Sequence, residues 1–275
     1  MPVRSLPGIA FGSGMSGRLV SGWIATVLLA ALIGAPLALV AWLSLRDPAG
    51  QGVSGLAWVT LATSSEATLA LSYSIAMGAA IALVSSVCSL PLAYQIGVRG
   101  GIVARVILAL LMILWLLDPG MRILGWMQIM KSGTLLGLLP DYVQGSYIAE
   151  LAAGIHAWLP MAAILQAFSF ARVPSTLLTT ARECGASPLT IFNRILWPRS
   201  RRWFAFSASL IFCGAVGGFL EPRLLGSSLF EQATEWLQRA MEREVGWPYA
   251  STMLLALLVV AIVPPLLMLG GRRRA

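Results

Sequence analysis

Charged side chains are scarce in this sequence. Only 11% of its 275 residues are charged, whereas 58% are apolar, and soluble domains carry about 25% charged residues. The mean hydropathy is +0.82. This balance excludes a disordered chain, a collagen and a single water-soluble globule. It indicates a protein that crosses a membrane several times.

Histidine and cysteine are also rare. The single histidine, His156, leaves a histidine-rich metal centre without ligands. Cys88, Cys184 and Cys213 are odd in number and far apart, so neither a disulfide framework nor a C-x-x-C metal site is supported. The chain also lacks the G-x-x-x-x-G-K-[ST] phosphate loop of nucleotide-binding proteins. We therefore expect no metal or cofactor in this chain.

Charge-poor stretches predict the fold. A bilayer core about 30 Å thick needs about 20 apolar residues in helix. The sequence predicts an all-α integral membrane protein with six spans, at about 19–45, 69–98, 104–130, 148–171, 203–220 and 247–270. Residues 1–18, rich in Gly and Ser, are expected to form a flexible leader, and 272–275 a basic tail.

The distribution of Lys and Arg predicts the orientation. With both termini on one side, that side carries 13 basic residues and one acidic residue, Glu183. The basic residues are Arg4, Arg18, Arg99, Arg105, Arg172, Arg182, Arg194, Arg199, Arg201, Arg202, Arg272, Arg273 and Arg274. Cytoplasmic loops carry such an excess, so both termini are predicted to be cytoplasmic. Topology thus explains the net charge of +8, and nucleic acid is not an expected partner.

The loop 172–202 is far longer than a connector needs to be. Pro174 and Ser175 signal a helix start, and Gly185 stands where a helix C-terminus favours a positive φ. Ser187 and Pro188 then signal a second helix, which Pro198 is expected to end. The pattern predicts two short helices around a glycine turn. It is consistent either with docking into a partner's groove or with an amphipathic hairpin lying on lipid headgroups.

Polar residues within predicted spans are candidates for a substrate pathway. Asp118 and Arg122 are four residues apart and would share a helix face, with a break expected at Pro119 and Gly120. They are interpreted either as a substrate-facing patch or as an ion pair. Trp126 is interpreted as a stacking platform for a cation or as an interfacial belt residue.

Three further residues have either a role in the substrate pathway or a purely structural one. His156 either lines the pore or hydrogen-bonds between helices. Glu150 and Glu221 mark outer span boundaries and either meet the substrate or are solvated. The periplasmic segment 221–246 carries apolar residues at helical spacing, which indicates an amphipathic helix across the outer mouth. This helix either contacts a binding protein or covers the helix bundle.

The loop resembles a known motif. Its stretch ARECGASPLTIFNRILWP resembles the EAA loop of ABC-importer permeases, with Ala181, Gly185, Ile195 and Pro198 in register. Thr179 stands in place of the motif's Glu, and Thr180 in place of its first Ala. Three other motifs, RILGW, GGFLEPRLLG and WPYAS, resemble those of the spermidine/putrescine type of permease, and their order agrees from about residue 69 onward.

The resemblance implies a type I (MetI-like) permease in a bacterial inner membrane. Such a subunit forms half of a dimeric pore, and a heterodimer with a second permease is favoured. It implies a cytoplasmic ATPase dimer that binds ATP and Mg, and a periplasmic solute-binding protein. The loop residues implied to contact the ATPase are Thr179, Thr180, Ala181, Arg182, Glu183, Gly185, Ala186, Ile195 and Pro198. A polyamine is the favoured solute, and an amino-acid derivative, phosphonate or metal chelate the alternative.

Other functional classes fit less well. No nucleophile motif accompanies His156, so an intramembrane enzyme is not supported. A secondary transporter often shows paired internal repeats with broken helices, and no second copy of the loop motif is present. A membrane scaffold would not need the loop. The sequence therefore predicts a transport subunit rather than an enzyme.

Overall fold

The computed structural model describes residues 14–48, 52–130, 143, 145–226, 231–243 and 246–270. This part of the chain is helical, apart from an isolated antiparallel bridge between Arg46 and Val53. Its elements are α1 (Gly14–Ser44), α2 (Leu56–Thr63), α3 (Ser65–Cys88), α4 (Leu90–Tyr94), the π-helical turn η1 (Gln95–Arg99), α5 (Gly101–Leu116), α6 (Pro119–Met130), α7 (Tyr147–Ala171), α8 (Ser175–Glu183), α9 (Pro188–Ile191), the π-helical turn η3 (Phe192–Leu196), α10 (Trp197–Val216), α11 (Leu220–Leu225), α12 (Ala233–Met241) and α13 (Trp247–Gly270).

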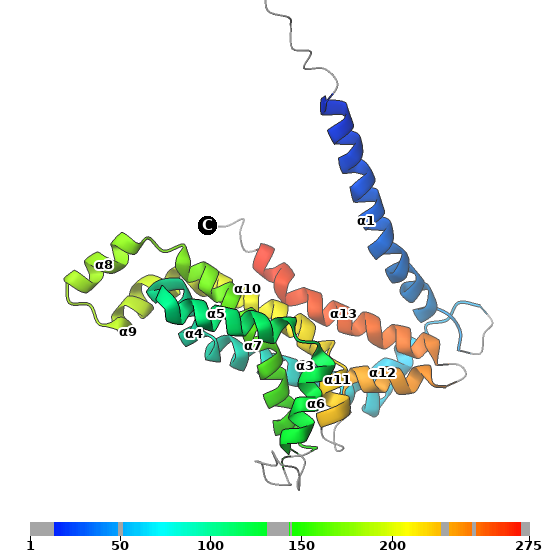
Figure 1. The fold of residues 1–275 in the computed structure, drawn as a ribbon. Coiled ribbons are helices and arrows are strands. Elements are labelled where there is room, and N and C mark those ends of the chain that lie inside the picture. Colours follow the sequence, from blue (N-terminus) through cyan, green and yellow to red (C-terminus); the bar gives the residue numbers. More distant parts are fainter. Residues whose placement is uncertain are drawn as a thin grey trace, which may run out of the picture.

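The centre of the molecule is a bundle of α3, α7 and α10, against which α13 and α12 pack. Figure 1 shows α8 and α9 projecting from one end of this bundle, while α6, α11 and α12 lie toward the other end. Helix α1 contacts α13 and diverges from the bundle (Figure 1). Its candidate span Trp23–Ser44 is exposed over nearly its whole length, and only Ser44 at its end is buried. This apolar surface needs lipid or another protein around it.

Within the described residues, four stretches are long and apolar enough to cross a membrane, or five if α5 and α6 form one broken span. The four are Trp23–Ser44, Ser65–Arg99, Tyr147–Ala171 and Trp247–Leu266. Helix α10 is not among them, and it carries Arg199, Arg201 and Arg202 in its first turns. The prediction of six spans therefore stays a prediction for the described residues.

The break expected at Pro119 and Gly120 within 104–130 is present, and it lies just before Pro119, between Leu116 and Pro119. Helices α5 and α6 meet at a bend of 99°, with Leu117 extended at ψ 134° between them. Pro119 disfavours helical backbone at the residue before it. The Asp118 carboxylate then accepts from the backbone N–H of Gly120 at 2.8 Å and so caps the start of α6.

The expected end of the second loop helix at Pro198 is wrong. The chain continues from α9 through η3 into α10, with Pro198 in the first turn of α10. In η3 the Trp197 N–H donates to the Phe192 carbonyl, and this wider turn shifts the carbonyls that the proline ring would otherwise meet. Helix α10 covers Trp197–Val216, so its bounds differ from those of the predicted span 203–220.

The predicted ends of the chain agree only in part. Helix α1 already begins at Gly14, so the expected leader 1–18 overlaps it, and residues 1–13 and 272–275 lie outside the described residues. The amphipathic helix expected within 221–246 is α12, at whose start the Glu235 carboxylate accepts from the Gln232 backbone N–H at 3.0 Å. Phe230, expected on its apolar face, also lies outside the described residues.

Candidate functional site

The predicted helix, glycine turn and helix are present as α8, Gly185 and α9, which we call the elbow (residues 175–191). Gly185 has φ +76°. Its N–H donates to the Arg182 carbonyl and the Ala186 N–H to the Ala181 carbonyl, both at 2.9 Å. These two bonds form a Schellman motif, which satisfies the last carbonyls of α8. A residue with a side chain is strained at this φ, which is why the turn needs glycine.

One face of the elbow is anchored on the bundle. Leu178 and Ile191 are buried, and they share a hydrophobic cluster with Phe170 of α7, Ala93 of α4 and Leu196 of η3. The opposite face of the elbow is exposed. Of the loop residues singled out from the sequence, Thr179, Thr180, Arg182, Glu183, Gly185 and Pro198 are exposed, whereas Ala181, Ala186 and Ile195 are half-buried. The elbow is therefore fixed at its base and free on its outer side.

The base of the elbow depends on a close approach at Gly97 in η1. A Cβ atom at this position would lie 2.5 Å from the Ala167 carbonyl oxygen and 2.9 Å from the Phe170 Cβ. Only a glycine therefore allows η1 to run this close to α7. The contact keeps α7 against the helices that support α8.

At the other end of the bundle lies a cavity of about 510 Å³, which we call the Arg122–Glu221 pocket. It is built by the α5–α6 bend, by α7 and by the start of α11. Its lining residues are Trp115, Leu117, Pro119, Arg122, Ala157, Trp158, Phe219, Leu220 and Glu221. Residues on both sides of the α5–α6 bend thus form one wall of a polar and aromatic pocket.

The structure gathers most of the predicted pathway residues at or beside this pocket. Arg122 donates through Nη1 to the Ala157 carbonyl at 3.2 Å. Trp126 donates through Nε1 to His156 Nδ1 at 3.3 Å, and the two rings meet edge to face at 5.7 Å. Asp118 is exposed, and within the described residues no ion pair joins it to Arg122. Because Asp118 precedes α6, the expected shared helix face is wrong.

Glu221 lies in the first turn of α11 and lines the pocket. In the described part of the chain its carboxylate has neither a hydrogen bond nor an ion pair. A carboxylate near a helix N-terminus is favourably placed with respect to the helix dipole. It is therefore available to a ligand with a hydrogen-bond donor.

Glu150 differs from the solvated boundary residue that was one expectation, since it is 1% exposed. Tyr73 donates to it at 3.1 Å, and the Gln232 amide donates to its other oxygen. Beside them, Ser74 accepts from the Ala233 N–H at 2.9 Å. This network fastens the start of α12 to α3 and α7. Nothing in the sequence pattern pairs these residues, because they lie far apart along the chain.

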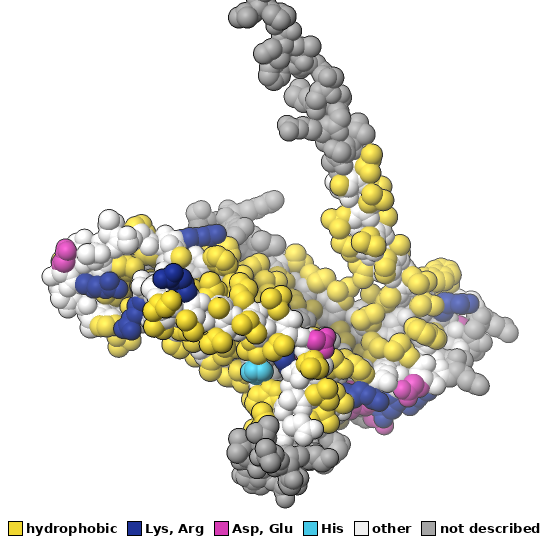
Figure 2. Space-filling view, viewed as in Figure 1, with side chains coloured by type: hydrophobic (Ala, Val, Ile, Leu, Met, Phe, Trp, Pro, Cys, Tyr) yellow, Lys and Arg dark blue, Asp and Glu magenta, His cyan; other side chains and the backbone are white. Residues whose placement is uncertain are grey.

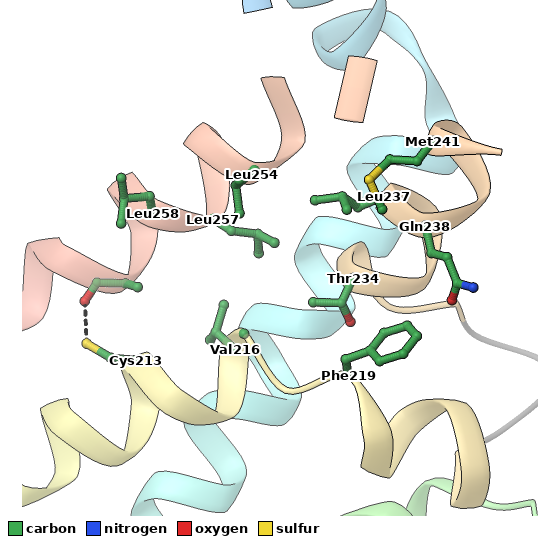
Figure 3. A pocket seen from close by; sticks show the side chains of 12 residues that line it. Cys213, Val216, Phe219, Thr234, Leu237, Gln238, Met241, Leu254, Leu257 and Leu258 are labelled. Atoms are coloured by element: carbon green, nitrogen blue, oxygen red, sulfur yellow. Dashed lines mark hydrogen bonds between the residues drawn. The ribbon is translucent and has the colours of Figure 1, made fainter. Parts of the chain in front are cut away.

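A second, apolar pocket of about 570 Å³ lies between α10, α12 and α13 (Figure 3). Leu254, Leu257 and Leu258 form one wall, and Val216 and Leu237 face them. Cys213 at its edge donates to the Ala261 carbonyl. Such walls offer few partners to a hydrophilic solute, so we place the candidate solute site at the Arg122–Glu221 pocket.

Solved structures share this fold. A bacterial ABC transporter involved in the import of the acidic polysaccharide alginate has a chain that matches with a TM-score of 0.72 and 13% identity, over 94% of this chain and 95% of that one. A bacterial alginate ABC transporter in complex with alginate pentasaccharide-bound periplasmic protein matches with a TM-score of 0.75 and 15% identity, over 94% of each chain. The MetNI methionine ABC transporter matches with a TM-score of 0.53 and 18% identity, over 76% of this chain and 95% of that one.

These identities establish likeness of fold alone, and the fold is that of MetI-like permeases. The family model described as "Binding-protein-dependent transport system inner membrane component" matches residues 89–269, which include the elbow and the Arg122–Glu221 pocket. The chain therefore belongs to the family of binding-protein-dependent transport system inner membrane components, the permease subunits of ABC importers.

Proposed function

We propose that this permease passes a small cationic solute, of which a polyamine is the favoured example, from the periplasm to the cytoplasm. A separate cytoplasmic ATPase dimer supplies the energy and binds the exposed face of the elbow. The solute reaches the Arg122–Glu221 pocket from a periplasmic binding protein. Both termini are cytoplasmic, and six spans cross the bacterial inner membrane.

The observation that carries the solute proposal is the free carboxylate of Glu221 in an aromatic pocket. Trp115, Trp158 and Phe219 line the same cavity as Glu221. A carboxylate and aromatic faces both attract an ammonium group, and the attraction grows where water is excluded. The Arg122 guanidinium donates to the Ala157 carbonyl and keeps its positive charge, so Glu221 and the aromatic rings have to outweigh its repulsion of a bound amine.

A second solute class is favoured by the presence of Arg122 itself. Arg122 and Glu221 line one pocket and are not paired with each other within the described residues. A zwitterionic amino-acid derivative would place its carboxylate at the guanidinium and its amine at Glu221. This solute is the alternative to a polyamine.

The fold suggests how movement of the elbow reaches the pocket. The chain is helical from α9 through η3 to the end of α10 at Val216, and Phe219 and Glu221 follow three and five residues later, at the start of α11. A push on the elbow is therefore carried along one element to the pocket wall. Because packed helices switch between discrete arrangements rather than deforming smoothly, ATPase closure would favour one access state over the other.

The remaining partner is a second, similar permease, and a heterodimer is favoured.

Uptake measurements test the proposal. Radiolabelled putrescine uptake is expected to stop when the partner ATPase is inactivated and to persist with a protonophore, whereas a secondary transporter would show the reverse pattern. Glu221→Gln should raise the KM for putrescine, while Glu242→Gln, which changes an exposed carboxylate just after α12, should not. An unchanged KM in Glu221→Gln would overturn the proposal that a cationic solute binds at Glu221. It would not bear on the proposal that an ATPase drives uptake, which the inactivation experiment tests separately.

A further inference from the structure

We propose that a cavity beside α12, which we call the Arg243 pocket, binds the phosphate of a phospholipid headgroup. The cavity has a volume of about 200 Å³ and lies between α2, α3, α12 and α13, away from the Arg122–Glu221 pocket. Its lining residues are Thr60, Ser64, Glu66, Trp236, Arg239, Ala240, Arg243 and Tyr249. No residue of this pocket takes part in the proposed solute path.

The pocket is rich in unused hydrogen-bond donors. Four lining side chains have no side-chain hydrogen bond in the described part of the chain: the hydroxyls of Thr60 and Tyr249, the indole N–H of Trp236 and the guanidinium of Arg243. Phosphate oxygens accept several such bonds at once, and an arginine can bind them in a bidentate manner. This donor set therefore fits a phosphate better than an amine.

The charges leave Arg243 as the uncompensated group. Arg239 forms ion pairs with Glu231 and, at 3.5 Å, with Glu66. No carboxylate within the described residues pairs with Arg243. Figure 2 shows basic and acidic side chains together over α12, next to an apolar surface. Arg243 thus supplies the attraction for an anion, and Glu66 opposes it.

The position of the pocket favours a lipid as the source of the phosphate. The candidate span of α3 begins at Ser65 and that of α13 at Trp247, each within two residues of a lining residue. The pocket therefore lies level with the end of the apolar slab, where Trp and Tyr are enriched and headgroups reside. In the orientation proposed above this is the outer leaflet. Trp247 is exposed beside it, as expected for an interfacial residue.

Native mass spectrometry of the full chain in detergent, with the subunits that purify with it, tests this inference. The probe is phosphatidylglycerol. Arg243→Gln should weaken binding of one lipid about tenfold, because it removes a charge-assisted bond, and Arg243→Lys should weaken it less. Glu66→Gln should strengthen binding, because it removes a like charge and the weaker of the two ion pairs of Arg239. Arg46→Gln, an exposed arginine outside the pocket, is the matched control.

The lipid affinity is expected to fall in Arg243→Gln and to rise in Glu66→Gln. A general loss of structure would lower the lipid affinity of both variants, so the two explanations can be told apart. Excess inorganic phosphate should not displace the lipid, because the acyl chains hold it at the apolar surface. The proposal is overturned if Arg243→Gln binds lipid as the Arg46 control does, if inorganic phosphate displaces the lipid, or if a cross-linker at Arg243→Cys captures an acidic segment of the binding protein in place of lipid. None of these readouts depends on transport.

Discussion

Gly185 offers the sharpest test of the elbow. Its φ of +76° lies in the left-handed region, which costs about 1–2 kcal/mol for a residue with a Cβ atom and up to about 3 kcal/mol for a strained position. A Cβ at Gly185 would meet no atom within 4 Å. The expected effect of Gly185→Val is therefore assigned to backbone strain, because the added Cβ atom itself meets no neighbour.

The size of the effect can be worked out from that strain. A penalty of about 2 kcal/mol lowers the population of the intact turn about 30-fold relative to unwound alternatives. Loss of the turn breaks the bonds from Gly185 and Ala186 to the end of α8, which reorients α8 against α9. Asparagine tolerates the left-handed region, so Gly185→Asn should keep most of the uptake while Gly185→Val loses nearly all of it.

The assay is solute uptake at matched membrane levels of each variant. Gly55→Val is the control, because Gly55 has φ −89° and its Cβ also has open space. We expect uptake to fall in the order Gly, Asn, Ala, Val at position 185 and to be kept in Gly55→Val. Full uptake with valine at position 185, or equal loss with asparagine and valine, would refute the reasoning.

Three further predictions follow from packing and hydrogen bonding. Leu178→Ala should destabilise the purified protein by about 2–5 kcal/mol in thermal unfolding, because Leu178 is 5% exposed, whereas Thr179→Ala on the exposed face should change stability by less than about 0.5 kcal/mol. Gly97→Val should reduce the folded yield, because its side chain meets the α7 backbone; wild-type yield would show that η1 does not need this close approach. A double-mutant cycle of Trp126→Phe and His156→Ala should give a coupling of about 1 kcal/mol from their hydrogen bond, and additive losses would show that the bond contributes nothing.

The elbow could be predicted from the sequence because its signals are local. Ser187 accepts from the Thr190 N–H, as its place before Pro188 predicted, and Gly185 adopts the predicted positive φ. Caps and turns of this kind involve residues within about four positions of each other. The continuation of the helix past Pro198 escaped prediction, because a preceding π turn can accommodate the proline and leaves no clear sequence pattern.

For the Arg122–Glu221 pocket, the sequence predicted individual residues but not that they lie together. Arg122, Trp126, His156 and Glu221 stood out because polar and aromatic groups in apolar stretches are conspicuous. That Arg122 and Glu221 line the same cavity depends on the 99° bend between α5 and α6 and on the packing of α11 beside them.

The sequence by itself determined that the protein is helical and apolar and that a glycine turn separates two short helices. These features follow from hydropathy, proline, glycine and capping residues, all of which act over a few residues of chain. Only the tertiary structure decided that Glu150 is buried by Tyr73 and Gln232 and that α2, α3, α12 and α13 enclose the Arg243 pocket. Such contacts join residues distant in the chain, and they depend on how closely helices pack, which local sequence preferences do not specify.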